Sequence, residues 1–340
     1  MLESYSWYKL LPDESEEVHE EYLHLFFDTM LERQCIWERR FIQELERPWT
    51  DDPILRDNKF TNVYRELDRN SQWQIKNILL DDRLNLTNLI WKLMVFRVFN
   101  NPNTFSCDLA KRWKNGIPNY DEYNEEEFTQ FIRDVRASGA NPFTNAYLIN
   151  SVAAKGDTRD NCYCHLTIPT IHKSVPRIIA KAMTASRPEE LIEEFKKIPT
   201  VAGFIAHEFY QDFTYIARYT NRKFMKFTQN DFTNVGPGAM VGIRLVFPST
   251  PSSRQEKRIY DLRDMAEEQL KLAEIRKGVK MPYLHWDKEN KKYYTSGECN
   301  ITLHQIEMWL CEFQKYWKMM IGKGKQRSKF IPKTKEIIVK

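Results

Sequence analysis

Residues 124–139 read NEEEFTQFIRDVRASG, and this stretch shows most clearly the pattern that decides the fold class. Asn124 stands where a helix N-cap is expected, and Glu127 follows it at the spacing of a capping box. Apolar side chains then recur at three- and four-residue steps, at Phe128, Phe131, Ile132 and Val135. Gly139 can close the helix, because glycine readily adopts a left-handed backbone. The stretch therefore predicts an amphipathic helix over residues 124–138.

The same helix signals recur along the chain. Ser186 with Glu189, and Ser253 with Glu256, have the spacing of capping boxes, so we expect helices that end near Lys197 and Gly278. The second of these helices would carry the apolar residues Ile259, Met265, Leu270 and Ile275. Further helices are predicted over residues 17–45, 63–80, 84–99, 203–219 and 302–320. Two short runs, 283–286 and 292–295, predict a hairpin. The fold class is therefore all-α with at most a small β-hairpin.

The composition is that of a folded protein with little room for glycine-rich sites. The chain has 340 residues, of which 42% are hydrophobic and 13% aromatic, enough to bury a sizeable core. Only 11 residues are glycine, which leaves little for phosphate loops or dinucleotide-binding folds. Neither a run of 18 apolar residues nor a signal-type leader occurs, so we expect a cytoplasmic protein without a membrane partner. One intertwined domain over residues 1–321 fits this pattern.

Charge is distributed unevenly although the net charge is only +4. Residues 322–340 hold seven bases and one acid, and this predicts a flexible basic tail that either contacts DNA phosphates or is simply solvated. The six cysteines lack the density and spacing of a disulfide scaffold, so we expect reduced thiols. Cys162, Cys164, His165 and His172 are too closely spaced for a usual structural zinc site, and no metal site is predicted there.

Two stretches could carry chemistry. Residues 47–69 interleave aromatic, amide, carboxylate and guanidinium groups, a mixture suited to stacking on a base and gripping its phosphates. The same residues could instead cap turns, pair Arg65 with Asp68 and pack their aromatic rings. Residues 235–244 contain a tight glycine-proline turn before an apolar run, like the hairpin of a helix-hairpin-helix DNA binder. An ordinary glycine-rich turn would look similar.

Together with residues 307–316, these stretches resemble the alpha-glutamyl/putrescinyl thymine pyrophosphorylase family of phage thymine hypermodification. The family comprises amino acid:DNA transferases and the helical domain of 5-hydroxymethyluracil DNA kinases, and it is thought similar to all-α DNA glycosylases. The resemblance runs in order from about Glu32 to Trp317. It implies a DNA-glycosylase-like helical domain with a helix-hairpin-helix-like element. The form FTNVYR at residues 60–65 looks more like the kinase-associated branch, so the branch stays open.

The resemblance also implies a set of site residues. The leading hypothesis is a base-flipping transferase that displaces pyrophosphate from 5-pyrophosphomethyluracil in double-stranded DNA with an amino acid or polyamine. Arg65 and Lys315 would stabilise the leaving group, and Asp68, Glu307 and Glu312 would serve as bases. Substrate and DNA would be bound by Trp49, Asp52, Phe60, Asn62, Gly236, Gly238 and Tyr316.

Several alternatives remain beside these roles. No cofactor is firmly indicated, but the three carboxylates could instead hold Mg²⁺. Glu312 and Lys315 could form an ordinary surface pair, and Cys311 is more typical of a small buried residue than of a nucleophile.

Two other function classes compete with the transferase. The first is a non-catalytic, base-flipping DNA-binding module that works with a 5-hydroxymethyluracil DNA kinase. Without a P-loop motif, the chain is not expected to be such a kinase by itself, since Gly322-Lys323-Gly324-Lys325 is too short. The second is a DNA glycosylase, which ranks last because Arg244 and Phe247 stand where its catalytic lysine or aspartate would be expected.

Overall fold

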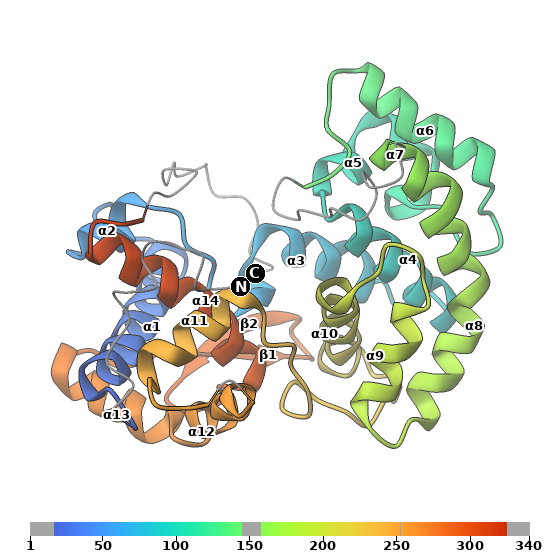
Figure 1. Cartoon of the computed structure of the whole chain (residues 1–340). Helices are drawn as coiled ribbons and strands as arrows, with labels where there is room; N and C mark the ends of the chain where they lie inside the picture. Colours follow the sequence, from blue (N-terminus) through green and yellow to red (C-terminus); the bar gives the residue numbers. More distant parts are fainter. Residues whose placement is uncertain (1–16, 145–157, 252, 325–340) are drawn as a thin grey trace. The chain divides into compact units, whose positions relative to one another are not determined.

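The computed structural model describes residues 17–144, 158–251 and 253–324. The chain folds into two compact units, which Figure 1 shows in sequence colours. We call Met1–Asp68 with Thr233–Lys340 the terminal unit, and Arg69–Phe232 the central unit. The first unit is built from both ends of the chain. The basic tail predicted over 322–340 lies outside the described residues after Gly324, and the single-domain expectation stays a prediction.

The terminal unit is helical apart from one hairpin. Its helices are α1 (Glu20–Phe41), α2 (Pro53–Asp57), α11 (Pro237–Val246), α12 (Arg258–Asp264), α13 (Ala266–Lys277) and α14 (Leu303–Met320). Single 3₁₀ turns occur at Arg65–Leu67 and Gln255–Lys257. Strands β1 (Tyr283–Asp287) and β2 (Lys292–Ser296) pair antiparallel, with Tyr283 opposite Ser296 and Asp287 opposite Lys292. The all-α class and the small hairpin are thus confirmed.

Helix α14 forms the centre of the terminal unit, between α1 and α11 (Figure 1). Its buried face includes Trp309, Phe313 and Trp317, and the Phe313 ring meets Phe26 of α1 edge-on at 5.5 Å. The Trp309 indole donates a hydrogen bond of 3.0 Å to the carbonyl oxygen of Phe26. Burying these large rings supplies the hydrophobic stabilisation of the unit, and the hydrogen bond satisfies the one polar atom of the Trp309 side chain.

The central unit holds the remaining helices. They are α3 (Arg69–Gln74), α4 (Leu86–Phe99), α5 (Pro102–Ser106), α6 (Glu125–Ala137), α7 (Arg159–Cys162), α8 (Ile168–Thr184), α9 (Pro188–Lys196) and α10 (Gly203–Tyr219), with π-helical turns at Ile75–Leu79 and Tyr163–Thr167 and 3₁₀ turns at Asp108–Arg112 and Lys114–Gly116. In its core, Arg97 of α4 pairs with Asp212 of α10 at 2.5 Å and with Glu208 at 3.3 Å. All three side chains are buried, so removal of Arg97 would leave the two carboxylates without a compensating charge.

Several predicted boundaries are wrong. The helix expected over 63–80 breaks into a 3₁₀ turn, α3 and a π-helical turn, because Asp68 between the first two has an extended backbone. The long helix expected up to Gly278 is interrupted at Met265, which separates α12 from α13. The box at Ser186 uses Glu190 instead of Glu189, since the Glu190 carboxylate accepts the Ser186 and Arg187 amides at 3.1 and 3.2 Å.

Candidate functional site

All of the site residues predicted from the sequence lie in the terminal unit. Helix α14 carries five of the residues singled out, namely Glu307, Cys311, Glu312, Lys315 and Tyr316. Three segments distant in sequence reach this helix: the start of α2, residues 60–68 and the start of α11. The structure therefore brings these three segments together against α14.

Glu312 joins α14 to the segment after Phe60. One carboxylate oxygen accepts a hydrogen bond of 2.5 Å from the Lys315 ammonium, and the other accepts the Thr61 amide at 3.3 Å. The two residues do form the pair considered as an alternative, with the Glu312 side chain buried and that of Lys315 42% exposed. Burial acts to lower the pKa of Lys315, but the Glu312 carboxylate outweighs it and the pKa is raised. Lys315 therefore stays cationic at neutral pH.

Asp52 joins the start of α2 to α14. Its Oδ1 accepts the backbone amides of Ile54 and Leu55 at 2.8 and 3.0 Å, which caps the short helix. Its Oδ2 accepts the Tyr316 hydroxyl at 2.8 Å. Burial raises the pKa of Tyr316, and the Asp52 carboxylate raises it further, so the phenol remains a donor. The Phe60 ring lies 6.4 Å from the Tyr316 ring.

Asn62 lies in a hydrogen-bonded chain between Arg33 and Asp68. Its side-chain oxygen accepts from Arg33 at 2.7 Å, and its side-chain nitrogen donates to Asp68 Oδ1 at 2.9 Å. The backbone amide of Asn62 donates to the same Asp68 oxygen at 3.2 Å. Burial raises the pKa of Asp68, and the Arg65 guanidinium opposes that rise. These contacts fix the orientation of the Asn62 amide, which was predicted to bind substrate or DNA.

Arg65 and Lys315, expected around one leaving pyrophosphate, contact different parts of α14. Arg65 Nη1 lies 3.5 Å from the Met308 sulfur, whereas Lys315 binds Glu312. Met308 and Lys315 are seven residues apart, which places them about 10 Å apart along a helix axis. The joint role of these two cations stays a prediction.

Gly236 and Gly238 bring the start of α11 against α14. The Gly236 amide donates to Glu307 Oε1 at 3.4 Å, so this donor already has a protein partner. A Cβ at Gly238 would lie 2.7 Å from the Cys311 sulfur, so a side chain there would require that sulfur to move. Burial raises the pKa of Cys311 to about 12, which keeps the thiol protonated and unsuited to nucleophilic attack. Close helix packing therefore accounts for Gly238, whereas a Cβ at Gly236 would meet only Glu307 Oε1 at 3.7 Å, an ordinary contact.

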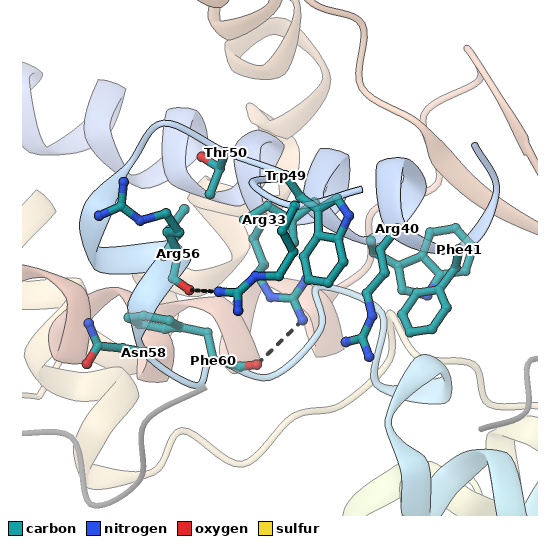
Figure 2. A pocket seen from close by; sticks show the side chains of 12 residues that line it. Arg33, Arg40, Phe41, Trp49, Thr50, Arg56, Asn58 and Phe60 are labelled. Atoms are coloured by element: carbon teal, nitrogen blue, oxygen red, sulfur yellow. Dashed lines mark hydrogen bonds between the residues drawn. The ribbon is translucent and has the colours of Figure 1, made fainter. Parts of the chain in front are cut away.

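A pocket opens beside this cluster, between α1 and residues 47–60 (Figure 2). Four arginines line it together with apolar and aromatic side chains: Arg33, Arg40, Arg47, Arg56, Ile36, Trp37, Phe41, Trp49, Leu55 and Phe60, with the polar Thr50 and Asn58. We call it the arginine pocket. Among these described lining residues none is acidic. Trp49 and Phe60 are predicted site residues, whereas Arg33 and Arg40 were not singled out from the sequence.

A sequence signal for the missed arginines does exist. Arg33 and Arg40 are seven residues apart, so they share one face of α1. Arg40 belongs to the run Trp37-Glu38-Arg39-Arg40-Phe41, which mixes bases with aromatic rings as residues 47–69 do. What the sequence does not show is that this face of α1 lies against residues 47–60.

The carboxylates predicted as bases or Mg²⁺ ligands do not form a metal site. Asp68, Glu307 and Glu312 each accept hydrogen bonds from different protein groups. Within residues 17–144, 158–251 and 253–324, no three His, Cys, Asp or Glu side chains are grouped as metal ligands would be. His165, considered for zinc, instead lies 2.9 Å from Glu125.

No helix in the described part of the chain is long and apolar enough to span a bilayer. The six cysteines all fall within that part, and each of them is a free thiol.

Comparison with known proteins identifies a family and a curated relative. The family model described as "5-hmdU DNA kinase, helical domain" matches residues 20–326. A 5-hmdU DNA kinase of Bacillus phage SP10 is 29% identical over 302 residues, which cover 86% of this chain. The match covers 44% of that kinase, so the chain spans less than half of the relative's length. No solved structure gives a significant match.

Proposed function

Since this chain belongs to the 5-hmdU DNA kinase helical-domain family, we propose that it is a DNA-binding module that holds 5-hydroxymethyluracil-containing DNA for modification. The relative's name supplies the modified base, and the family model that matches this chain is described as a helical domain. Because no P-loop motif occurs in this sequence, the phosphoryl-transfer chemistry would come from a separate kinase active site. The module's task is to bind the strand and expose the base.

The observation that carries this choice is that the proposed bases already have protein partners. Asp68 accepts from Asn62, Glu307 from the Gly236 amide, and Glu312 from Lys315 and Thr61. A general base must have a lone pair directed at the proton that it removes. Asp68 orders residues 62–68, and Glu307 and Glu312 hold α11 and residue Thr61 against α14, so these carboxylates are better suited to fixing a binding surface than to taking up protons.

The pyrophosphate-displacing transferase is a second candidate, and one feature favours it. Lys315 is 42% exposed at its side chain and is kept cationic by Glu312, so it could stabilise a departing pyrophosphate. The attacking group would be the free amine of an amino acid or polyamine, which displaces pyrophosphate from the methylene carbon of the base. In this case Arg65→Met and Lys315→Met should each reduce turnover by at least about 100-fold while the helical spectrum is retained.

Two measurements on the purified chain separate the candidates. The first compares binding to matched duplexes that contain either one 5-hydroxymethyluracil·A pair or one thymine·A pair. A preference of about 5-fold or more for the modified duplex supports the module, and equal or absent binding overturns it.

The second measurement incubates the chain with 5-pyrophosphomethyluracil DNA and a pool of amino acids and polyamines. Nucleoside mass spectrometry then looks for a new base. The module predicts none, whereas a new amine-bearing nucleoside that disappears in Lys315→Met establishes the transferase.

A further inference from the structure

The arginine pocket concentrates positive charge on a wall that is otherwise apolar. Arg33, Arg40, Arg47 and Arg56 line it, and Arg56 is paired bidentately with Asp57 at 2.9 and 3.1 Å. The remaining lining is mostly aromatic or aliphatic. A surface that combines several guanidinium groups with flat apolar rings is complementary to a phosphate joined to a base and sugar.

The arginines and the aromatic platform of this pocket are held in place. The Trp49 indole donates to the Leu45 carbonyl oxygen at 2.8 Å, and the Trp49 carbonyl oxygen accepts from Arg39 at 2.6 Å. The guanidinium carbons of Arg40 and Arg47 lie 5.0 and 5.5 Å from the Trp49 ring centroid. A guanidinium stacked over a ring keeps its N–H groups in its own plane, where they can bind an anion.

Arg33 closes the inner side of the pocket. It donates to Asn62 at 2.7 Å and approaches the Phe60 carbonyl oxygen at 3.5 Å, as the dashed line in Figure 2 shows for the latter. Arg47 likewise approaches the Arg56 carbonyl oxygen at 3.4 Å. Because backbone oxygens fix these side chains, less side-chain entropy is lost when an anion binds.

The arginines also repel one another. Burial lowers the pKa of Arg33 to about 10; Asp68 and Glu312 oppose this decrease, and the Arg40 charge makes a smaller contribution to it. Burial lowers the pKa of Arg40 as well, and the Arg47 charge adds to it. Arg33 and Arg40 remain protonated at neutral pH, so their mutual repulsion persists in the free protein. A bound anion would relieve it.

We propose that the arginine pocket binds the phosphate group of a nucleotide on Arg40 and Arg47, beside the half-buried Trp49 ring. The proposal rests on the proposed function, because it supplies the contact by which the module would hold a strand. A DNA strand and a free nucleotide share this chemistry, and the experiment has one arm for each.

The test uses the whole chain and a charge-matched control. Arg40→Gln/Arg47→Gln removes two charges from the pocket, and Arg254→Gln/Arg263→Gln removes two charges from the same unit near α12. Circular dichroism and thermal melting establish that each variant is folded. Fluorescence anisotropy then measures binding of a labelled 12-nucleotide oligothymidylate over a range of salt concentrations, and calorimetry measures binding of dTMP and of thymidine.

We expect the pocket variant to bind the oligonucleotide at least about 10-fold more weakly than the parent chain. Loss of two phosphate contacts should also flatten the slope of log affinity against log salt by about 1.4. The control variant should change affinity less than about 2-fold. If dTMP binds and thymidine does not, with dTMP binding lost in the pocket variant, the pocket takes a free nucleotide as well.

Unchanged affinity and slope in Arg40→Gln/Arg47→Gln would overturn the proposal, as would an equal loss in the control. Failure of the proposed function gives a different result. The chain would then show no preference for the 5-hydroxymethyluracil duplex, while dTMP binding and its loss in the pocket variant would persist.

Discussion

The contact between Gly238 and Cys311 predicts that Gly238→Ala lowers the stability of the parent chain but raises the stability of a Cys311→Ala variant. A Cβ added at Gly238 would lie 2.7 Å from the Cys311 sulfur, but 3.7 Å from the Cα and Cβ of Cys311. The sulfur is therefore the atom that excludes a side chain. Gly238→Ala should destabilise the protein, and it should stop doing so when Cys311→Ala removes that sulfur.

The magnitude follows from two opposing effects. Overpacking of this kind costs about 1–3 kcal/mol. Alanine in place of glycine in a helix gains about 0.5–1 kcal/mol. In the parent chain we expect Gly238→Ala to lower the free energy of unfolding by about 1–2 kcal/mol. In the Cys311→Ala background the same change should raise it by about 0.5–1 kcal/mol, which gives a coupling energy near 2 kcal/mol.

Urea titrations of the four proteins of this cycle measure the coupling. Gly297→Ala is the matched control, because no atom lies within 4 Å of its added Cβ. The control should change stability by about 0.5 kcal/mol or less in both backgrounds. If Gly238→Ala is equally destabilising with and without Cys311, the sulfur does not set the approach of α11 to α14 and the reasoning is refuted.

Three further predictions concern single interactions. Tyr316→Phe removes the hydrogen bond to Asp52 and should lower the free energy of unfolding by about 1 kcal/mol, whereas an unchanged urea midpoint would show that the bond contributes nothing. Lys315→Met leaves the buried Glu312 carboxylate without its cation and should cost about 1–3 kcal/mol of unfolding free energy. Glu312→Gln/Lys315→Met should recover most of this loss, and equal stability of the two variants would contradict the stabilising role of Lys315. Hydrogen bonds from Arg83 and Asn115 hold the pKa of Asp81 below its ordinary value, so Asp81 stabilises the folded state above about pH 4 and this contribution is lost as the pH falls. The stability difference between the parent chain and Asp81→Asn should therefore shrink between pH 6 and pH 3, and a constant difference would count against the ionised carboxylate.

Where helix signals are local, the sequence predicts the elements closely. Asn124 caps α6 through the Glu127 amide at 3.0 Å, as its spacing predicts, and α10 has the predicted bounds Gly203–Tyr219. Helix α8 was missed because Pro176 stands inside it. Its apolar residues Ile171, Val175 and Ile178 still bury one face, so tertiary packing outweighs the proline penalty there.

Contacts between distant segments explain the other differences. The helix expected over 63–80 breaks at Asp68, whose carboxylate holds Asn62 six residues earlier. Such a side-chain bond to the backbone competes with helix formation, but no periodic pattern shows it. The arginine pocket was missed for a similar reason. Arg33 and Arg40 become neighbours of Trp49 and Phe60 only when α1 packs against residues 47–60.

Hydrogen bonds from α14 hold both ends of the segment that forms one wall of the arginine pocket. Tyr316 holds Asp52 at one end of a short segment, and Glu312 holds Thr61 at the other. The residues between these two anchors include Arg56, Asn58 and Phe60, which line one wall of the pocket. Because both anchors come from a single buried helix, the wall is fixed by groups that do not themselves line the pocket. Under our proposals, residues of α14 therefore act as positioning residues, and their substitution would alter nucleotide affinity without removing a ligand-binding group.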